Sequence, residues 1–259
     1  MLTDTHAHLY WDSYKEDFDE VIKRALDAGV NTIINVGVDV KTSQKALEQA
    51  KKLKGLTVKS TIGIHPHESL RLAPLAQGKL LEEIYRSAPE KVVAVGECGL
   101  DYKEVDEQTK NGQRKLFQAQ IDLAKKLNLP LIVHCREAWD ETIEMTKDSF
   151  GIYHCYSGLS HTTSYILHNT NFLVSFAGNL TYPKNDYLRE AVKTIPLERI
   201  VLETDCPFLP PQSKRGQRNE PSSVLEIAQA VAEIKGLTLE EVAKQTSLNV
   251  KQILRLRSG

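Results

Sequence analysis

The chain has almost no excess of charge of either sign, no long hydrophobic run and no closely paired cysteines. Its 33 lysines and arginines against 34 aspartates and glutamates leave a formal net charge of -1. This balance argues against a protein that coats nucleic acid through bulk positive charge, although it leaves room for a local basic groove. No apolar run approaches the roughly 20 residues that span a bilayer, and the beginning has no signal-peptide hydrophobic region. The sequence therefore predicts a cytoplasmic protein with no membrane segment.

The four cysteines include no C-x-x-C pair, and disulfides are not expected in a cytoplasmic protein. No linker rich in proline, glycine or serine, no low-complexity tract and no repeat divides the 259 residues. This length suits a single α/β barrel. We therefore expect one domain over residues 1–259, and we find no sign of an obligate protein partner.

Short apolar runs rich in valine and isoleucine alternate with amphipathic helical stretches along the whole chain. The predicted strands cover residues 2–6, 32–36, 58–64, 92–96, 130–134, 151–154, 172–176 and 200–204. Runs that are apolar almost throughout are typical of strands buried on both faces, as in parallel sheets. Such an alternation fits either a closed (β/α)8 barrel or an open doubly wound sheet. Because His6-x-His8 stands where a Gly-x-Gly-x-x-Gly motif would follow the first strand, we predict the α/β fold of the TIM barrel.

Three helices carry clear local signals. An apolar stripe predicts a helix after the first strand, formed by Phe18, Val21, Ile22, Ala25 and Leu26 and stopped at Gly29. Two helices near the end of the chain have candidate capping boxes, Ser223 with Glu226 and Thr238 with Glu241.

Imidazoles and carboxylates stand at or just after the ends of six predicted strands. They are His6, His8, His65, Glu97, His134, His154 and Asp205. Barrel active sites lie at the carboxyl ends of the strands, so these side chains are expected to converge. Any one of them alone could be a loop cap or a hydrogen-bonded core histidine. Several unpaired polar groups buried together would cost about 1–3 kcal/mol each, and a shared metal ion removes that cost.

Each cysteine directly follows one of these candidate ligands. Side chains alternate along a strand, so a residue after an inward-pointing ligand points toward the helices. We therefore exclude from the metal site all four cysteines, Cys98, Cys135, Cys155 and Cys206. The remaining nitrogen and oxygen donors exceed what one catalytic ion with open positions takes, so they favour two divalent ions. A carboxylate such as Glu97 can bridge ions about 3.5–4 Å apart.

Seven motifs, spread nearly end to end, carry a family resemblance. They are DTHAHL at 4–9, GIHPH at 63–67, GECGLDY at 96–102, LPLIVHCREA at 129–138, HCYSG at 154–158, LETDCPFLPP at 202–211 and RGQRNEPS at 215–222. In this order they resemble the TatD family of metal-dependent deoxyribonucleases, within the amidohydrolase-like barrels.

The resemblance implies a (β/α)8 barrel and two divalent ions, with Mg²⁺ or Mn²⁺ expected and Zn²⁺ as an alternative. By match to the motifs, His6, His8, Glu97 and Asp205 would hold one ion. Glu97, His134 and His154 would hold the other. The family includes 3′→5′ exonucleases, so the resemblance also implies hydrolysis of single-stranded DNA.

For phosphodiester hydrolysis the ions would activate a water and neutralise the phosphate, with Glu97 between them. Asp205 is our candidate general base, unless it serves only as a ligand. Arg136 could bind a phosphate oxygen or pair with a nearby acid, and His65 could contact the phosphate or support the site. The basic loop 213–221 could track the DNA backbone through Lys214, Arg215 and Arg218. Tyr102 and Tyr156 could stack bases or simply pack.

Two other functions stay open at this level. A metal-activated water attacks carbon as well as phosphorus, so an ester or amide hydrolase such as a D-aminoacyl-tRNA deacylase is one alternative. A non-catalytic barrel scaffold is the other, and the loss of a ligand position would favour it. No ligand position is missing.

Overall fold

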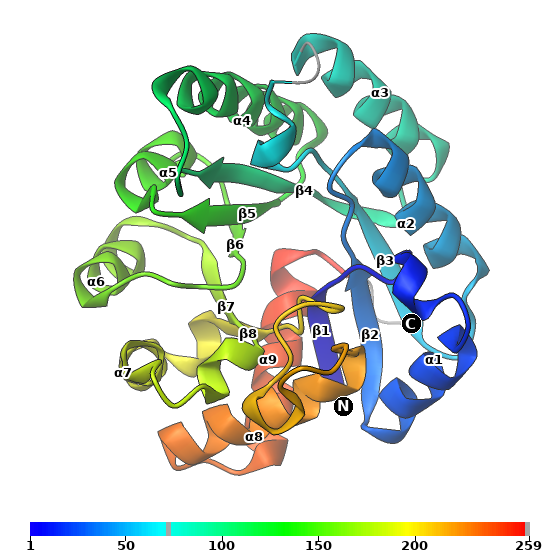
Figure 1. Cartoon of the computed structure of the whole chain (residues 1–259), viewed down its shortest axis with the longest axis vertical. Coiled ribbons are helices and arrows are strands. Elements are labelled where there is room, and N and C mark those ends of the chain that lie inside the picture. Colours follow the sequence, from blue (N-terminus) through cyan, green and yellow to red (C-terminus); the bar gives the residue numbers. More distant parts are fainter. Residues whose placement is uncertain (71–73, 257–259) are drawn as a thin grey trace.

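Eight parallel strands form a nearly closed barrel with helices around its outside (Figure 1). The computed structural model describes residues 1–70 and 74–256. Neighbouring strands pair in sequence order from β1 to β8, and a parallel bridge between Ala7 and Cys206 joins β1 to the segment after β8. The predicted (β/α)8 barrel is confirmed, and the open doubly wound alternative is wrong.

The strands lie within a few residues of the predicted ranges. They are β1 Leu2–Ala7, β2 Val30–Asn35, β3 Thr57–Ile62, β4 Val92–Asp101, β5 Leu131–Arg136, β6 Gly151–Tyr153, β7 Leu173–Phe176 and β8 Ile200–Leu202. The largest difference is β4, which continues five residues beyond the predicted end at position 96. Its pairing with β5 shifts register between Val95 and Cys98 and then resumes. Glu97 therefore lies at an irregularity inside the strand rather than after its end.

The helices are α1 Phe18–Asp27, α2 Val40–Lys52, α3 Pro74–Ser87, α4 Glu107–Leu127, α5 Trp139–Thr146, α6 Ser160–Asn169, α7 Asp186–Thr194, α8 Val224–Lys235 and α9 Leu239–Ile253. Within the described residues, none is long and apolar enough to cross a membrane. The box of Thr238 and Glu241 caps α9 as predicted. The predicted box at Ser223 is wrong: this residue is the last of a short 3-10 turn over Pro221–Ser223 and makes no capping bond, and Glu226 accepts a hydrogen bond from Ser213 instead.

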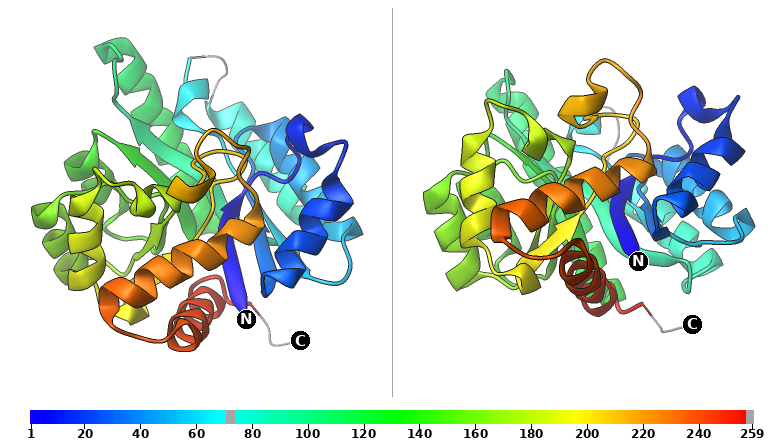
Figure 2. Two further views of the ribbon diagram at one scale, coloured as in Figure 1. Left: turned by 60° about the horizontal axis from the view of Figure 1, so that its bottom comes forward. Right: turned by 90° about the horizontal axis from the view of Figure 1, so that it is seen from below.

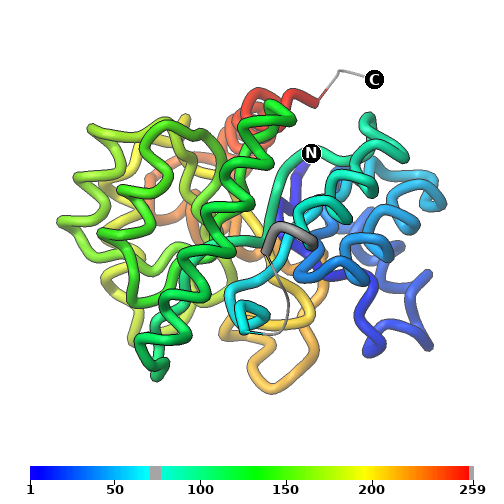
Figure 3. Tube along the Cα trace, turned by 90° about the horizontal axis from the view of Figure 1, so that it is seen from above, coloured from blue at the N-terminus to red at the C-terminus, as the bar shows by residue number. Residues whose placement is uncertain are grey.

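Helix α9 covers the end of the barrel at which the strands begin. A cluster of buried residues links the strand residues Ile34, Val93, Ile132 and Val201, among others, to Val250 and Leu254 near the end of α9. Figure 2 shows α9 beside the start of β1, and Figure 3 shows it opposite the loop that follows β8. Because apolar packing closes this end, the strand carboxyl ends remain as the accessible face of the barrel.

The loops after β1 and β8 are joined by a buried tyrosine. The hydroxyl of Tyr14, in a 3-10 turn over Asp12–Tyr14, donates a 2.6 Å hydrogen bond to the carbonyl of Asn219. The Asn219 side chain donates in turn to the carbonyls of Thr204 and Phe208. The two loops, which follow strands at opposite ends of the sequence, are therefore held in a fixed relation.

Replacement of Tyr14 by phenylalanine is expected to lower the free energy of unfolding by about 1–3 kcal/mol, because it leaves the buried Asn219 carbonyl without its partner. Urea unfolding of both proteins measures the difference. Tyr165→Phe is the matched control, since Tyr165 is exposed on α6. An equal effect of the two changes would contradict the structural role of the Tyr14 hydroxyl.

Candidate metal centre

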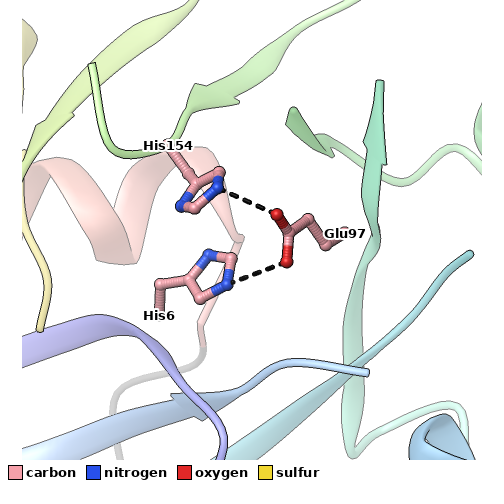
Figure 4. Close-up of side chains that lie close together, drawn as sticks. All are labelled: His6, Glu97 and His154. Carbon is pink, nitrogen blue, oxygen red and sulfur yellow. Dashed lines mark ion pairs between the residues drawn. The ribbon is translucent and has the colours of Figure 1, made fainter. Parts of the chain in front are cut away.

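The carboxylate of Glu97 lies among four imidazoles that come from four different strands or the loops after them. Its Oε1 is 3.0 Å from Nε2 of His154, 3.1 Å from Nδ1 of His134 and 3.5 Å from Nε2 of His65. Its Oε2 is 3.3 Å from Nε2 of His6. Figure 4 shows His154 and His6 facing opposite oxygens of this carboxylate. Glu97 is thus placed to be shared between two groups of ligands.

Asp205 completes the group on the side of β1. Its Oδ1 is 3.4 Å from Nε2 of His8 and 3.8 Å from Nε2 of His6. The residue has a φ of 54°, a left-handed conformation that side chains seldom adopt. A hydrogen bond of 2.8 Å from its backbone N–H to the carbonyl of His6 holds it there. The left-handed conformation at Asp205 is therefore supported by direct attachment to His6.

Glycine permits the close approach of β3 and β4 that brings His65 to Glu97. A Cβ atom at Gly63 would collide with the backbone of Gly96. The glycine of the GIHPH motif is thus explained by packing at the site.

The described residues contain three groups of donor atoms that could hold a metal ion. They are His6 with Glu97 and His154, His6 with His8 and Asp205, and His65 with Glu97 and His134. All six residues predicted as ligands belong to these groups, and the four cysteines do not. His65 is an addition, because the sequence suggested only a role near the phosphate.

Three of the histidines have their outward ring nitrogen fixed by a hydrogen bond. Nδ1 of His8 lies 2.9 Å from the carbonyl of Val36, and Nδ1 of His154 lies 3.2 Å from Glu203. Nε2 of His134 lies 3.2 Å from Asp101. A proton on each of these nitrogens leaves the inward nitrogen as a lone-pair donor, the state that metal binding requires.

Glu203 and Asp101 were missed as functional residues by sequence reasoning. Both are almost fully buried. A signal was present, because Glu203 stands two residues before Asp205 and Asp101 stands four after Glu97. Regular side-chain alternation does not apply to either pair, because Glu97 lies at the irregularity in β4 and Glu203 and Asp205 follow the end of β8, so the signal was only closeness in sequence to a predicted ligand.

The electrostatics of the site favour a cation. Burial alone would raise the pKa of Glu97, but the imidazoles of His154 and His65 hold it well below its usual range. Burial would likewise raise the pKa of Asp205, and His8 and His6 lower it. Both carboxylates are therefore ionised at neutral pH. Neither ring nitrogen of the fully buried His6 has a hydrogen-bond partner. An ion bound at Nε2, the nitrogen that faces Glu97, would supply a partner for that nitrogen. The donor set fits divalent metal ions.

A cavity of about 800 Å³ opens over these residues. Five of the six predicted ligands line it, while His6 lies beneath, and His65 and Arg136 also line it. Arg136 approaches Asp101 at 3.6 Å and leaves half of its side chain exposed. The cavity therefore offers a solvent-accessible route to the inward side of the ligand group.

Lys214, Arg215 and Arg218 do not belong to the residues described as lining this cavity. Lys214 donates to Ser223, and the Arg215 guanidinium lies 4.4 Å from the centre of the Tyr182 ring. Arg218 is bound by Asp17 at 2.6 Å and by Glu220 at 3.0 Å, so it also helps to hold the loop, and its phosphate contact stays a prediction. The DNA-tracking role of Lys214 and Arg215 stays a prediction.

The structure corrects part of what the sequence predicted for the tyrosines and cysteines near the rim. Tyr156 is buried and its hydroxyl pairs with Thr163, so it cannot stack a base. The Tyr102 hydroxyl donates to Glu141. Side-chain alternation predicted that the cysteines point toward the helices, but Cys135 and Cys155 line the cavity. Cys155 has a φ of 44°, which departs from the regular strand conformation on which that prediction rested.

A barrel with histidines and carboxylates gathered around a cavity at its strand ends defines the class of metal-dependent hydrolases of the (β/α)8 type. A model of one family in this class, described as TatD related DNase, matches residues 3–255. The chain belongs to the TatD family, as the sequence motifs indicated.

Individual relatives agree with this assignment. YabD of Bacillus subtilis (strain 168), an uncharacterized metal-dependent hydrolase, is 40% identical over 99% of this chain and 100% of its own length. The 3′-5′ ssDNA/RNA exonuclease TatD of Erwinia tasmaniensis is 33% identical over 98% of this chain and 99% of its own. The crystal structure of YJJV, a TatD homologue from Escherichia coli K12, superposes with a TM-score of 0.91 at 26% identity, covering 99% and 98% of the two chains.

Proposed function

We propose that this protein hydrolyses phosphodiester bonds of single-stranded DNA from the 3′ end, with two divalent ions bound by its strand-end ligands. The observation that carries the proposal is the position of Glu97, whose Oε1 faces His154, His134 and His65 while its Oε2 faces His6. A bridging carboxylate of this kind is typical of two-metal hydrolysis. A relative at 33% identity that is named a single-stranded DNA and RNA exonuclease supports the choice of substrate.

His6, His8, Glu97 and Asp205 would hold one ion, and Glu97, His134 and His154 the other. We assign Mg²⁺ or Mn²⁺ to these positions, with Zn²⁺ as the alternative. When bound, such ions act as Lewis acids toward a phosphate oxygen and lower the pKa of a water. His65 lies close enough to Glu97 to assist the second group of ligands or to contact the phosphate.

In the proposed reaction, a water oxygen forms a bond to phosphorus as the bond from phosphorus to the 3′ oxygen breaks. Asp205 is ionised and lines the cavity, so it can take the proton that the water releases. The 3′ oxygen leaves with a proton from solvent, and the product is a nucleoside 5′-monophosphate. Arg136, at the cavity wall, neutralises charge on the phosphate.

A comparison of substrates tests the proposal. The metal-loaded protein is assayed on a single-stranded oligonucleotide, the same sequence as a duplex, an aryl ester and a D-aminoacyl-tRNA. We expect the highest kcat/KM on the single strand, with nucleoside 5′-monophosphates as products. Hydrolysis of the ester or the aminoacyl-tRNA by a protein that leaves DNA intact would contradict the proposal and favour carbon as the site of attack.

Metal affinity is expected to rise with pH. Burial would lower the pKa of His154, but Glu97 and Glu203 raise it well above the usual histidine value. Burial opposes ionisation of His8 and His134 in the same way, and their acidic partners nevertheless raise the pKa of each ring. Below these raised values the rings hold protons that an ion must displace. As pH rises through them the protons leave, so affinity should increase about tenfold per pH unit for each proton displaced.

Calorimetric titration of the metal-free protein with Mn²⁺ at about pH 6 and about pH 8 measures this dependence. Buffers with different ionisation enthalpies count the released protons. His168→Gln, a change of an exposed histidine on α6, serves as the control and should leave the slope unaltered. An affinity that is flat or falls with pH would contradict the assignment of these rings as ligands.

A further inference from the structure

Two aromatic side chains are exposed at the mouth of the cavity. Trp11 lies in the loop after β1 and Phe208 in the loop after β8, and they are 39% and 44% exposed. Their ring centres are 5.2 Å apart and their planes are inclined by 79°, so one ring meets the other edge-on. Both side chains line the cavity. Together they form what we call the aromatic wall, Trp11 with Phe208.

This exposure contrasts with the second tryptophan of the chain. Trp139 packs on α5 against Tyr153 and Tyr156, with ring centres 5.6 Å and 5.0 Å away. Trp11 and Phe208 lie outside the hydrophobic core formed by the described residues. A large apolar surface left open beside a cavity typically marks a binding site.

The wall is attached directly to the proposed metal ligands. The backbone N–H of Trp11 donates to the carbonyl of His8 at 3.1 Å, and that of Phe208 donates to the carbonyl of Asp205 at 2.9 Å. The ring centres of Trp11 and Phe208 lie 6.2 Å and 6.1 Å from that of His8. The aromatic surface therefore begins where the ligand group ends, and its position relative to that group is fixed before substrate binds.

We propose that the aromatic wall stacks a nucleobase adjacent to the phosphate under attack. The inference rests on the proposed nuclease function and deepens it. The edge-on arrangement leaves a ring face uncovered by the partner ring, and such a face accepts any of the bases. In a duplex the bases are stacked on one another, so the wall selects single strands, whose bases can turn outward.

Fluorescence provides a test that does not depend on turnover. The chain has two tryptophans, and stacking of a base on Trp11 should quench its emission. We expect dGMP with Mg²⁺ to quench the wild-type protein and Trp139→Phe, in which only Trp11 emits. It should not quench Trp11→Phe, in which only Trp139 emits. Deoxyribose 5-phosphate, which carries no base, should quench none of them.

Kinetics with baseless substrates provide the second test. Oligonucleotides that lack the base at the last or at the penultimate 3′ position are compared with the complete strand. Trp11→Ala is expected to lower kcat/KM on the complete strand about tenfold or more, and to change it less than about twofold on the strand that lacks the stacked base. Trp11→Phe should retain most of the activity because it keeps a ring. Tyr165→Ala, the change of an aromatic residue that is 51% exposed on α6, should alter neither rate.

The two proposals fail in different ways. Quenching by dGMP in a protein that cleaves no DNA would overturn the nuclease function and leave the stacking site in place. Cleavage of DNA with equal losses from Trp11→Ala on complete and baseless strands would overturn the stacking site and leave the nuclease function in place. Equal quenching of Trp11→Phe and the wild type would also overturn the stacking site.

Discussion

Asp205→Asn is expected to lower kcat on single-stranded DNA by about 10³-fold while the fold is retained. The carboxamide has nearly the shape of the carboxylate, so the backbone bond between residue 205 and the carbonyl of His6 can persist. The amide cannot take a proton from water at neutral pH, and it is a weaker ligand. Steady-state rates, together with circular dichroism and the melting temperature, separate a loss of chemistry from a loss of structure.

Asp27→Asn is the matched control for this change. Asp27 is exposed on α1 and does not line the cavity, so the same loss of charge there should leave kcat within about twofold of wild type. An Asp205→Asn protein that turns over at a rate near that of the control would remove Asp205 from the mechanism.

Removal of metal is expected to reduce cleavage below about one-thousandth of the starting rate, and Mg²⁺ or Mn²⁺ should restore it. The reason is the geometry around Glu97, where four imidazoles surround one carboxylate and together offer a donor set that suits divalent cations. The protein is treated with EDTA and dialysed, and the metal is then returned stepwise. The activity and the number of ions bound are measured at each step.

Glu97→Gln is the variant that makes this test specific. A neutral amide cannot bridge two cations as a carboxylate does, so returned metal should bind with lower stoichiometry and restore little activity. Activity that survives chelation, or full restoration in Glu97→Gln, would contradict a metal centre organised by this residue.

In the proposed function, different side chains of this chain recognise the phosphate and the base. Arg136 and the proposed metal ligands would contact the phosphate, which every nucleic acid has. Trp11 and Phe208 would contact the base, which they can reach only when it is unstacked from its neighbours. Trp11 and Phe208 come from the loops after β1 and β8, and the hydrogen bond from Tyr14 to Asn219 holds these two loops together.

Local patterns were sufficient for the secondary structure and for the ligand types. Strands buried on both faces have to be apolar, and an imidazole or carboxylate at the end of such a strand stands out against that background. This is why the strand ranges and the six ligands were predicted from sequence. The prediction of a capping box at Thr238 was correct for the same reason, since the residues of a capping box interact across one turn.

Patterns failed where the outcome depended on a distant partner. Ser223 looked like a cap, but Lys214 donates to its hydroxyl. Local patterns likewise did not indicate that the guanidinium of Arg218 pairs with Asp17, about two hundred positions earlier in the chain. Glu97 was placed after its strand because nothing in the sequence announces the shift of register between β4 and β5.

The sequence alone determined an eight-stranded α/β protein with histidines and acids at its strand ends, because burial and side-chain alternation act over a few neighbouring residues. Only the tertiary structure decided that His65 also meets Glu97, which acids orient the histidines, which charges are already paired, and that an aromatic wall stands beside His8. Those contacts join residues as far apart as His6 and Asp205. Their formation depends on closure of the barrel, which no local stretch of the sequence encodes by itself.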